Sequence, residues 1–269
     1  MAKGIVANLA SQGMQILIQK MKEAAKAVIE LGSDFTASLS KVEALSGATT
    51  SEMSRLSDRA QELGRSTIFT ATNVSDAFGY MALAGWDTTQ MLDGIEGVLN
   101  LAAASGMDLA QASDMVTDYL TAFGLEASDA AQMVDMLTYA QANSNTTTEQ
   151  LGQAFGNTAS SMHAAGQSME TTTAVLEAFA NQGLKGSEAG TALAAITRDI
   201  TQKMEDGKIM IGDTAVTVQD ANGNFRNLVD ILADVETATE GMGSAEKSAA
   251  LMTISRSEER RVGKECRSR

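Results

Sequence analysis

The sequence predicts a mainly α protein: a multi-helix bundle with a long N-terminal amphipathic helix and one small β-hairpin near residues 208–224. The 269 residues include no proline, whereas the usual frequency of about 5% would give on the order of a dozen. Proline breaks helix interiors and is common in loops, so its absence favours closely spaced helices. Apolar residues also recur every three or four positions along most of the chain, which is the period of a helix buried on one side.

Residues 1–46 are expected to form a long amphipathic helical lead-in. Its apolar stripe runs from Ile5 to Leu45. If neither Gly13 nor Gly32 interrupts it, about 40 residues at ~1.5 Å each would span roughly 60 Å. Charged residues between Lys20 and Glu30 exclude a membrane span. Packing against partner helices, a coiled coil and an interfacial membrane helix all remain open.

Residues 47–254 are expected to form one helical domain with regular start and stop signals. Thr49 with Glu52 and Asp108 with Gln111 have the spacing of capping boxes. Thr146 with Glu149, and Ser187, are expected to cap two later helices. The glycines expected to end helices are Gly64, Gly85, Gly106, Gly124 and Gly183.

One passage has strand character instead. Ile209–Ile211 and Ala215–Gln219 are short β-branched runs, and Asn222-Gly223 beyond them is a turn signal. These runs predict the small hairpin, with helix resuming near Phe225.

The C-terminal segment 255–269 differs abruptly in composition. From Arg256 it reads RSEERRVGKECRSR, with six Arg or Lys and three Glu in 14 residues. It resembles the translation of a common sequencing adapter, and we expect it to be an artefactual tail. Cys266, the only cysteine, would then carry no disulfide or thiol chemistry. The alternative is a genuine basic tail.

The net charge of −14 argues against a phosphate-binding surface, which needs clustered Lys and Arg. The sequence also opens with no pattern of a secretory signal peptide, and it contains no run of 18 apolar residues.

No catalytic, cofactor-binding or metal-binding residues are predicted. The single histidine, His163, has no second His or dependable Cys with which to form a zinc site or a catalytic dyad. The stretch Gly183–Thr191 superficially suggests a phosphate loop, but its Lys precedes the Gly and the preceding element is helical. Asp220–Asn224 imitates half of a calcium loop, yet Phe225 and Ile231 occupy the positions that need Gly and Glu.

Several motifs together resemble the core region of phage tail tape measure proteins. They are TIFTATNVSDAFGYMALAGW from Thr67, LNLAAASG from Leu99, GLKGSEAGTAL from Gly183, DANGNF from Asp220, LVDIL from Leu228 and AALMTI from Ala249. Each motif is weak alone, but their common order is fairly specific, and the likeness covers roughly Leu45 to Ile254. The family typically continues with Phe-Gly after Ile254, and this chain departs there.

This resemblance implies a virion structural protein of the phage tail, present in the host cytoplasm during assembly, with 47–254 as the tape measure core. Such proteins occupy the tail tube lumen, template its length and leave ahead of the DNA. The implied partners are the tail tube protein, tail assembly chaperones, baseplate or tail tip proteins, and further copies of the chain. No sequence-specific nucleic acid binding is implied, and membrane contact is expected only in downstream regions.

Two other functions remain open from sequence. One is a cellular helical or coiled-coil interaction protein, which gene neighbourhood would distinguish because tail genes should flank a tape measure gene. The other is a tail-associated cell-wall hydrolase whose catalytic part is missing.

Overall fold

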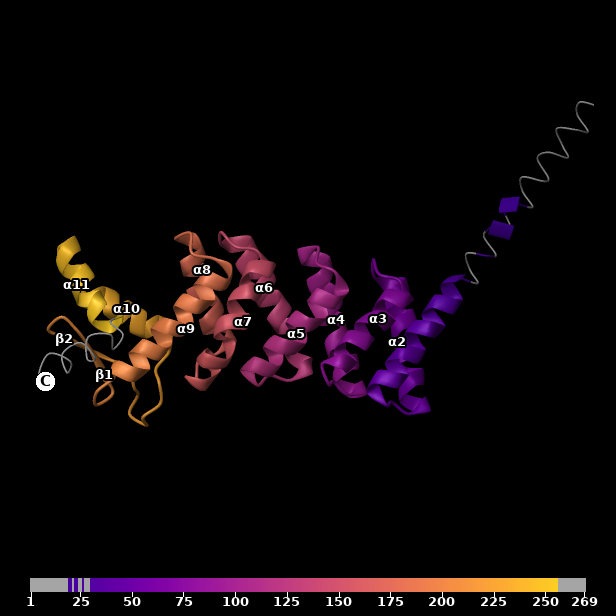
Figure 1. Cartoon of the computed structure of the whole chain (residues 1–269), viewed down its shortest axis with the longest axis horizontal. Coiled ribbons are helices and arrows are strands. Elements are labelled where there is room, and N and C mark those ends of the chain that lie inside the picture. The colour runs from indigo at the N-terminus through magenta and orange to yellow at the C-terminus, as the bar shows by residue number, and fades with distance from the viewer. Residues whose placement is uncertain (1–18, 21, 24–25, 27–29, 256–269) are drawn as a thin grey trace, which may run out of the picture. The chain divides into compact units, whose positions relative to one another are not determined.

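The computed structural model describes residues 19–20, 22–23, 26 and 30–255 (Figure 1). These residues are mainly helical with one two-stranded sheet, which confirms the predicted fold class. The helices after residue 46 are α2 (Thr50–Ser66), α3 (Ala71–Leu83), α4 (Thr88–Ser105), α5 (Leu109–Phe123), the 3₁₀ turn η1 (Ala127–Asp129), α6 (Ala130–Asn143), α7 (Thr148–Ala164), α8 (Met169–Asn181), α9 (Gly186–Lys203), α10 (Leu228–Ala238) and α11 (Ser244–Ser255). The strands are β1 (Lys208–Ile211) and β2 (Thr214–Thr217).

The described end of the N-terminal lead-in is helical over residues 30–46. This helix passes through Gly32 without a break, as the sequence allowed. Gly13 and most of the expected lead-in lie outside the described residues, as do residues 256–269 with Cys266.

By internal packing the chain divides into two compact units. The first contains the described residues up to Leu99 together with Asp108–Asp114, and the second contains Asn100–Met107 and the described residues from Met115 onward. The expected domains 1–46, 47–254 and 255–269 stay a prediction.

In the first unit, the N-terminal helix packs on α3. Val42 is fully buried and lies 4.0 Å from the position of a Cβ on Gly79. Ser38 Oγ donates a hydrogen bond to Asp76 Oδ1 at 2.6 Å. On α2, the buried side chains are Leu56, Ala60 and Leu63, whose spacing of four and three places them on one helical face.

In the second unit, the most extensive helix pair is α7 with α9. Both helices contribute small residues to this contact. A Cβ on Gly190 would lie 2.2 Å from the backbone oxygen of Ala154, so α9 approaches the backbone of α7 directly. Leu193 and Phe155 are fully buried beside this crossing.

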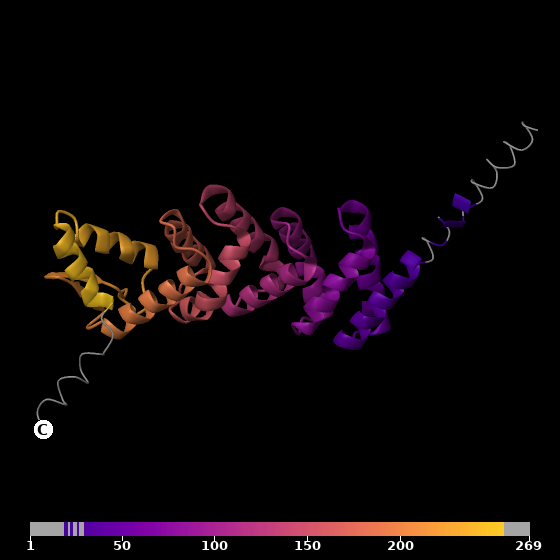
Figure 2. The same cartoon turned by 45° about the horizontal axis from the view of Figure 1, so that its top comes forward.

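The hairpin follows α9, and its register pairs Lys208 with Thr217 and Ile211 with Thr214. Its turn has Gly212 at φ 60°, the positive value that the first central residue of a type II′ turn requires. Ile209, Ile211 and Val216 on its inner face are buried. Helices α11 and α10 pack against β1 and β2 respectively, and Figure 2 shows both helices next to the hairpin. The predicted hairpin is confirmed.

Three boundary predictions were wrong by one to three residues. Helix α2 continues through Gly64 to Ser66, because this glycine serves close packing rather than termination. Thr147, not Thr146, caps α7 and forms a capping box with Gln150. Helix α9 begins at Gly186, before Ser187.

Candidate functional site

The three stretches weighed for chemistry lie on separate elements of the second unit. His163 lies in the last turn of α7, Gly183–Thr191 joins α8 to α9, and Asp220–Asn224 follows β2. Among the described residues, no group of three or more His, Cys, Asp or Glu side chains is placed to hold a metal ion. None of the described helices combines the length and apolar composition that a membrane span requires.

His163 is exposed and packs over the turn that ends α5. That turn contains Gly124 at φ 68°, and a Cβ there would lie 3.2 Å from His163 Cε1. The histidine therefore covers the glycine turn that ends α5.

The stretch Gly183–Thr191 forms a helix joint. Gly183 adopts φ 90°, and the amide of the next residue, Leu184, donates to Phe179 O at 3.0 Å, as in a glycine-terminated helix. Farther along, Gly190 makes the close contact with α7. The glycines of this motif thus end one helix and permit the approach of another.

Asp220 organises a tight turn with its own side chain. Its Oδ1 accepts hydrogen bonds from the amides of Asn222 at 2.9 Å and Asn224 at 2.8 Å. The backbone hydrogen bond from Asn224 is the main cause that lowers the pKa of the Asp220 carboxyl. The carboxylate is thus engaged by the turn itself, as expected of an Asx turn.

The first long motif, from Thr67 to Trp86, forms the α2–α3 joint and α3. Thr70 caps α3, and the side chains of Thr70 and Asn73 form a complete capping box. Just before the joint, Gly64 lets the backbone of Ala71 approach, since a Cβ at Gly64 would lie 2.5 Å from Ala71 N. At the other end of the motif, the buried Trp86 ring lies over Gly94 of α4, where a Cβ would be 2.3 Å from Cζ3.

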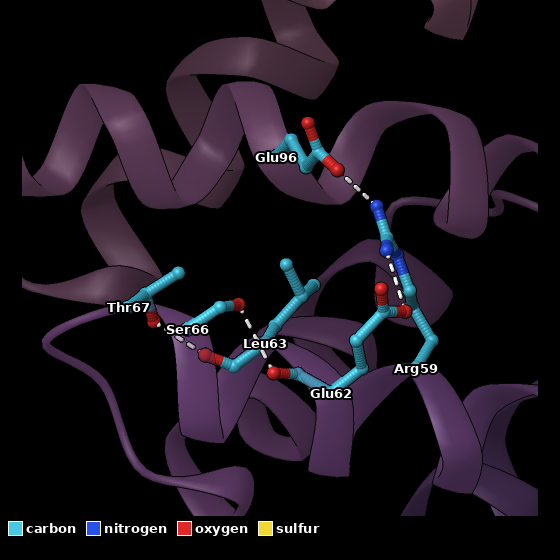
Figure 3. Close-up of polar contacts among 6 residues, drawn as sticks. All are labelled: Arg59, Glu62, Leu63, Ser66, Thr67 and Glu96. Carbon is cyan, nitrogen blue, oxygen red and sulfur yellow. Dashed lines mark hydrogen bonds and ion pairs between the residues drawn. The ribbon is translucent and has the colours of Figure 1, made fainter.

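Arg59 links α2 to α4 on the surface of the first unit. Its guanidinium bonds to Glu62 at 2.7 Å within α2 and also to Glu96 of α4, as Figure 3 shows. The hydrogen bond to Glu62 is the main cause that raises the pKa of Arg59. Because both glutamates are well exposed, at 61% and 59%, this pair contributes at most about 1 kcal/mol.

Gln167, in the joint between α7 and α8, is a structural residue that the sequence analysis missed. It is 4% exposed. Its Nε2 donates to Ala165 O at 3.2 Å and to Arg226 O at 3.0 Å, and its Oε1 accepts from Leu228 N at 2.7 Å. Nearby, Asn227 Nδ2 donates to Thr171 Oγ1 at 2.9 Å. These bonds attach the start of α10 to the α7–α8 joint, and a polar residue in a loop gives no sequence signal for such a role.

The Tyr119 hydroxyl of α5 donates to Gly152 O of α7 at 2.5 Å. Its ring and that of Phe123 both pack on Phe155, with centroids 5.4 and 5.8 Å apart. Burial is the main cause that raises the pKa of Tyr119 to about 12. The tyrosine is thus a buried, hydrogen-bonded tie between two helices.

One cavity of the second unit, about 60 Å³, is lined mostly by α6 and the start of α8. Three methionines contribute to it, and its lining residues are Leu125, Asp129, Gln132, Met133, Met136, Met169 and Glu170. A space of this size accommodates water rather than a substrate. The two motifs described above, Gly183–Thr191 and Thr67–Trp86, thus build joints between helices.

Comparisons with known proteins agree with the motifs. The sequence model of the family described as phage-related minor tail protein matches residues 57–255. The tape measure protein of Pneumococcus phage Dp-1 is 35% identical over 230 residues, which are 86% of this chain and 20% of that protein. The chain therefore spans about a fifth of the length of this relative. No solved structure matches the chain.

The family match covers most of the chain and includes every motif quoted above. It confirms the predicted likeness to tape measure proteins, and it favours a phage tail component over a cellular interaction protein. The chain belongs to the family of phage-related minor tail proteins.

Proposed function

We propose that this chain is the core part of a phage tail tape measure protein, a non-enzymatic structural component that takes part in tail tube assembly, tail length determination and DNA ejection. The observation that carries the proposal is the match to the minor tail protein family over residues 57–255, together with the tape measure relative. The absence of catalytic residues was expected from the sequence, and the joints built by its motifs are consistent with a structural role.

Within this protein, the core would act in assembly or docking rather than as the ruler itself. A ruler needs length that grows steadily with residue number, as a continuous helix supplies at about 1.5 Å per residue. Between residues 50 and 255, the longest described helices have 18 residues, and turns with positive-φ glycines separate many of them. The extended ruler would therefore lie in other parts of the full-length protein.

The proposed partners are the tail tube protein, tail assembly chaperones, baseplate or tail tip proteins and further copies of this chain, first in the host cytoplasm and then in the virion. Nucleic acid is not among them. No Lys or Arg occurs between Arg65 and Lys185, a stretch that carries many Asp and Glu residues. Such a surface repels phosphate, which supports passage of DNA without specific binding.

Tail length measured by electron microscopy tests this division of labour. In the full-length gene, one in-frame deletion removes residues 109–143, and a matched deletion removes 35 residues from a predicted long helix outside the core. The outside deletion is expected to shorten tails by roughly 50 Å, at about 1.5 Å per residue. The core deletion is expected to abolish tail assembly.

Unchanged tail length after the outside deletion would refute the ruler role. Complete tails shortened in proportion by the core deletion would show that the core is itself part of the ruler. Incubation of the purified chain with bacterial cell walls separately tests the non-enzymatic role, for which no loss of turbidity is expected.

A further inference from the structure

Four helices begin at an almost constant spacing along the chain. Helices α3, α5, α7 and α9 start directly after Thr70, Asp108, Thr147 and Lys185, which are 38, 39 and 38 positions apart. The first three of these helices are each followed by a second helix, namely α4, α6 and α8. The chain thus contains three helix pairs of similar length and a fourth first helix, α9.

The turn between the two helices of each pair has the same form. In each turn a glycine adopts a positive φ, and the amide after it donates a hydrogen bond to the carbonyl five positions earlier, as in a Schellman motif. The glycines are Gly85, Gly124 and Gly166. The amides that follow them are those of Trp86, Leu125 and Gln167, with hydrogen bonds of 3.1, 2.8 and 2.9 Å. The pairs therefore share their turn as well as their spacing.

Position five of each first helix, counted from the residue before the helix, is small and buried. It is occupied by Ser75, Ser113, Gly152 and Gly190. A Cβ on Gly190 would lie 2.2 Å from Ala154 O. A Cβ on Gly152 would lie 2.5 Å from Met115 Cε. Ala154 and Met115 are both position seven of the preceding first helix. Two successive helix contacts in the second unit therefore use the same register.

We propose that these helix pairs are copies of one repeat of about 38 residues, in which position seven of each first helix is the docking surface for position five of the next copy. In repeat proteins each copy contacts only its neighbours, so one recurring interface joins the copies. The hairpin follows α9, where the second helix of a fourth pair would begin. The proposal goes beyond the proposed function, which requires no repeat.

This interface accounts for two buried hydroxyls of the first unit. Ser75 and Ser113 are fully buried, and their Oγ atoms have no hydrogen-bond partner within the part of the chain that the structure describes. A close approach of two helices requires a small residue at position five, and it does not require a hydrogen bond there. By the register of the later copies, Ser113 docks on Ala77, which is position seven of α3 and is also fully buried.

A cysteine cross-link tests this register. In a Cys266→Ser chain, the pair Ser113→Cys and Ala77→Cys is expected to form a disulfide on oxidation with copper phenanthroline, detected by non-reducing peptide mapping and mass spectrometry. The control replaces Ala77 with Ala84 as the second cysteine position, seven residues farther along α3 and thus roughly 10 Å away, too far for a disulfide. Circular dichroism checks that both variants stay folded. A folded first pair that fails to cross-link, or equal cross-linking of the two pairs, would overturn the proposal.

An insertion provides a second test that needs no substitution. A second copy of residues 147–184 is inserted after Leu184 of the 269-residue chain. Gly152 of the inserted copy then meets the original Ala154, and Gly190 meets Ala154 of the inserted copy, so both new contacts pair residue types that already pack together. The variant is expected to unfold in urea in one transition, with a midpoint no lower than that of the wild type and a larger m-value, because more surface is exposed on unfolding.

The control insertion contains residues 147–166 alone, which places a first helix where a second helix belongs. It is expected to lower the urea midpoint by at least about 1 M. A whole-repeat insertion that lowers the midpoint as much as this control, or that unfolds in a separate transition, would contradict the repeat even if the cysteine variants fail to fold. Neither test measures tail length, so this proposal and the proposed function can fail separately.

Discussion

The joint between α2 and α3 and the joint between α7 and α8 are built on different principles. In the first, Thr67 Oγ1 donates to Leu63 O at 2.8 Å and Thr70 exchanges hydrogen bonds with Asn73, so every partner lies within four positions along the chain. In the second, Gln167 bonds to Arg226 and Leu228, which are 59 and 61 positions away. Local hydrogen bonds hold the first joint, whereas the second joint is also bonded to a segment far along the chain.

This difference predicts where substitutions cost most. Local caps should act singly and modestly, because each satisfies one or two helix-end amides. The loss of a contact between residues far apart in the sequence should destabilise the protein more, because it leaves buried groups unpaired or forces helices apart. The following variants test that ranking by urea unfolding followed by circular dichroism, starting with the largest expected effect.

Gly190→Ala is expected to destabilise the protein by about 3 kcal/mol, since overpacking costs 1–3 kcal/mol and more where relaxation is blocked. The new Cβ would lie 2.2 Å from the backbone oxygen of Ala154, so α9 must move away from α7. Gly156→Ala in α7 is the control. A Cβ there meets nothing within 4 Å, and the expected change is a gain of about 0.5–1 kcal/mol. Equal effects at both positions would contradict the close crossing.

Gln167→Ala is expected to cost about 2–3 kcal/mol, because it leaves the buried amide of Leu228 without its acceptor. Gln132→Ala is the matched control, since Gln132 is exposed and its side-chain hydrogen bond to Glu170, at 3.3 Å, lies at the surface. The control is expected to change stability by less than about 0.5 kcal/mol. Equal losses of stability in the two variants would show that the hydrogen bonds from Gln167 to Arg226 and Leu228 do not stabilise the protein.

Tyr119→Phe is expected to cost roughly 1 kcal/mol at pH 8 through the lost hydrogen bond to Gly152 O. The pKa of Tyr119 is raised from 10.0 to about 12 in the folded state. Its contribution is therefore fully present below pH 10 and is lost as the pH rises through about 12. The stability difference between wild type and Tyr119→Phe should shrink over that window. A difference that stayed constant from pH 9 to 12 would show that the hydroxyl is not buried.

Thr70→Ala is expected to cost about 1 kcal/mol, the usual value for a helix N-cap. The hydroxyl accepts from Asn73 N at 3.1 Å, and its loss leaves an exposed amide that water can reach. Thr89→Ala, at an exposed position in the first turn of α4, serves as the control with little change expected. A cost at Thr70 as large as that at Gln167 would remove the distinction between local and distant ties.

The same distinction explains how much of the structure the sequence predicts. The capping box at Thr49 and the helix ends at Gly106 and Gly124 were predicted, because their partners are neighbours in the chain. The tie at Gln167 and the bond from Tyr119 to Gly152 were not, since neither has a local pattern. Gly64 was mistaken for a helix end, because a glycine used for close packing looks the same in sequence as one used for a left-handed turn.

The smallest expected change in stability concerns a buried hydroxyl that takes part in neither a local cap nor a hydrogen bond between distant segments. Thr158 of α7 is 1% exposed, and its Oγ1 has no hydrogen-bond partner among the described residues. In α9, the hydroxyl of Thr197 donates to the carbonyl four positions earlier, Leu193 O, at 2.9 Å. The corresponding carbonyl for Thr158 belongs to Ala154, and it faces Gly190.

Thr158→Val is therefore expected to leave stability unchanged or to raise it by up to about 0.5 kcal/mol, because it replaces an unpaired buried hydroxyl with a methyl group. Thr197→Val removes a satisfied hydroxyl from an equally buried position and is expected to cost about 1 kcal/mol. Urea unfolding of the two variants side by side gives the comparison. A clear loss at Thr158 would mean that its hydroxyl does have a partner, and that the α7–α9 crossing is held by a polar tie as well as by the contact of Gly190.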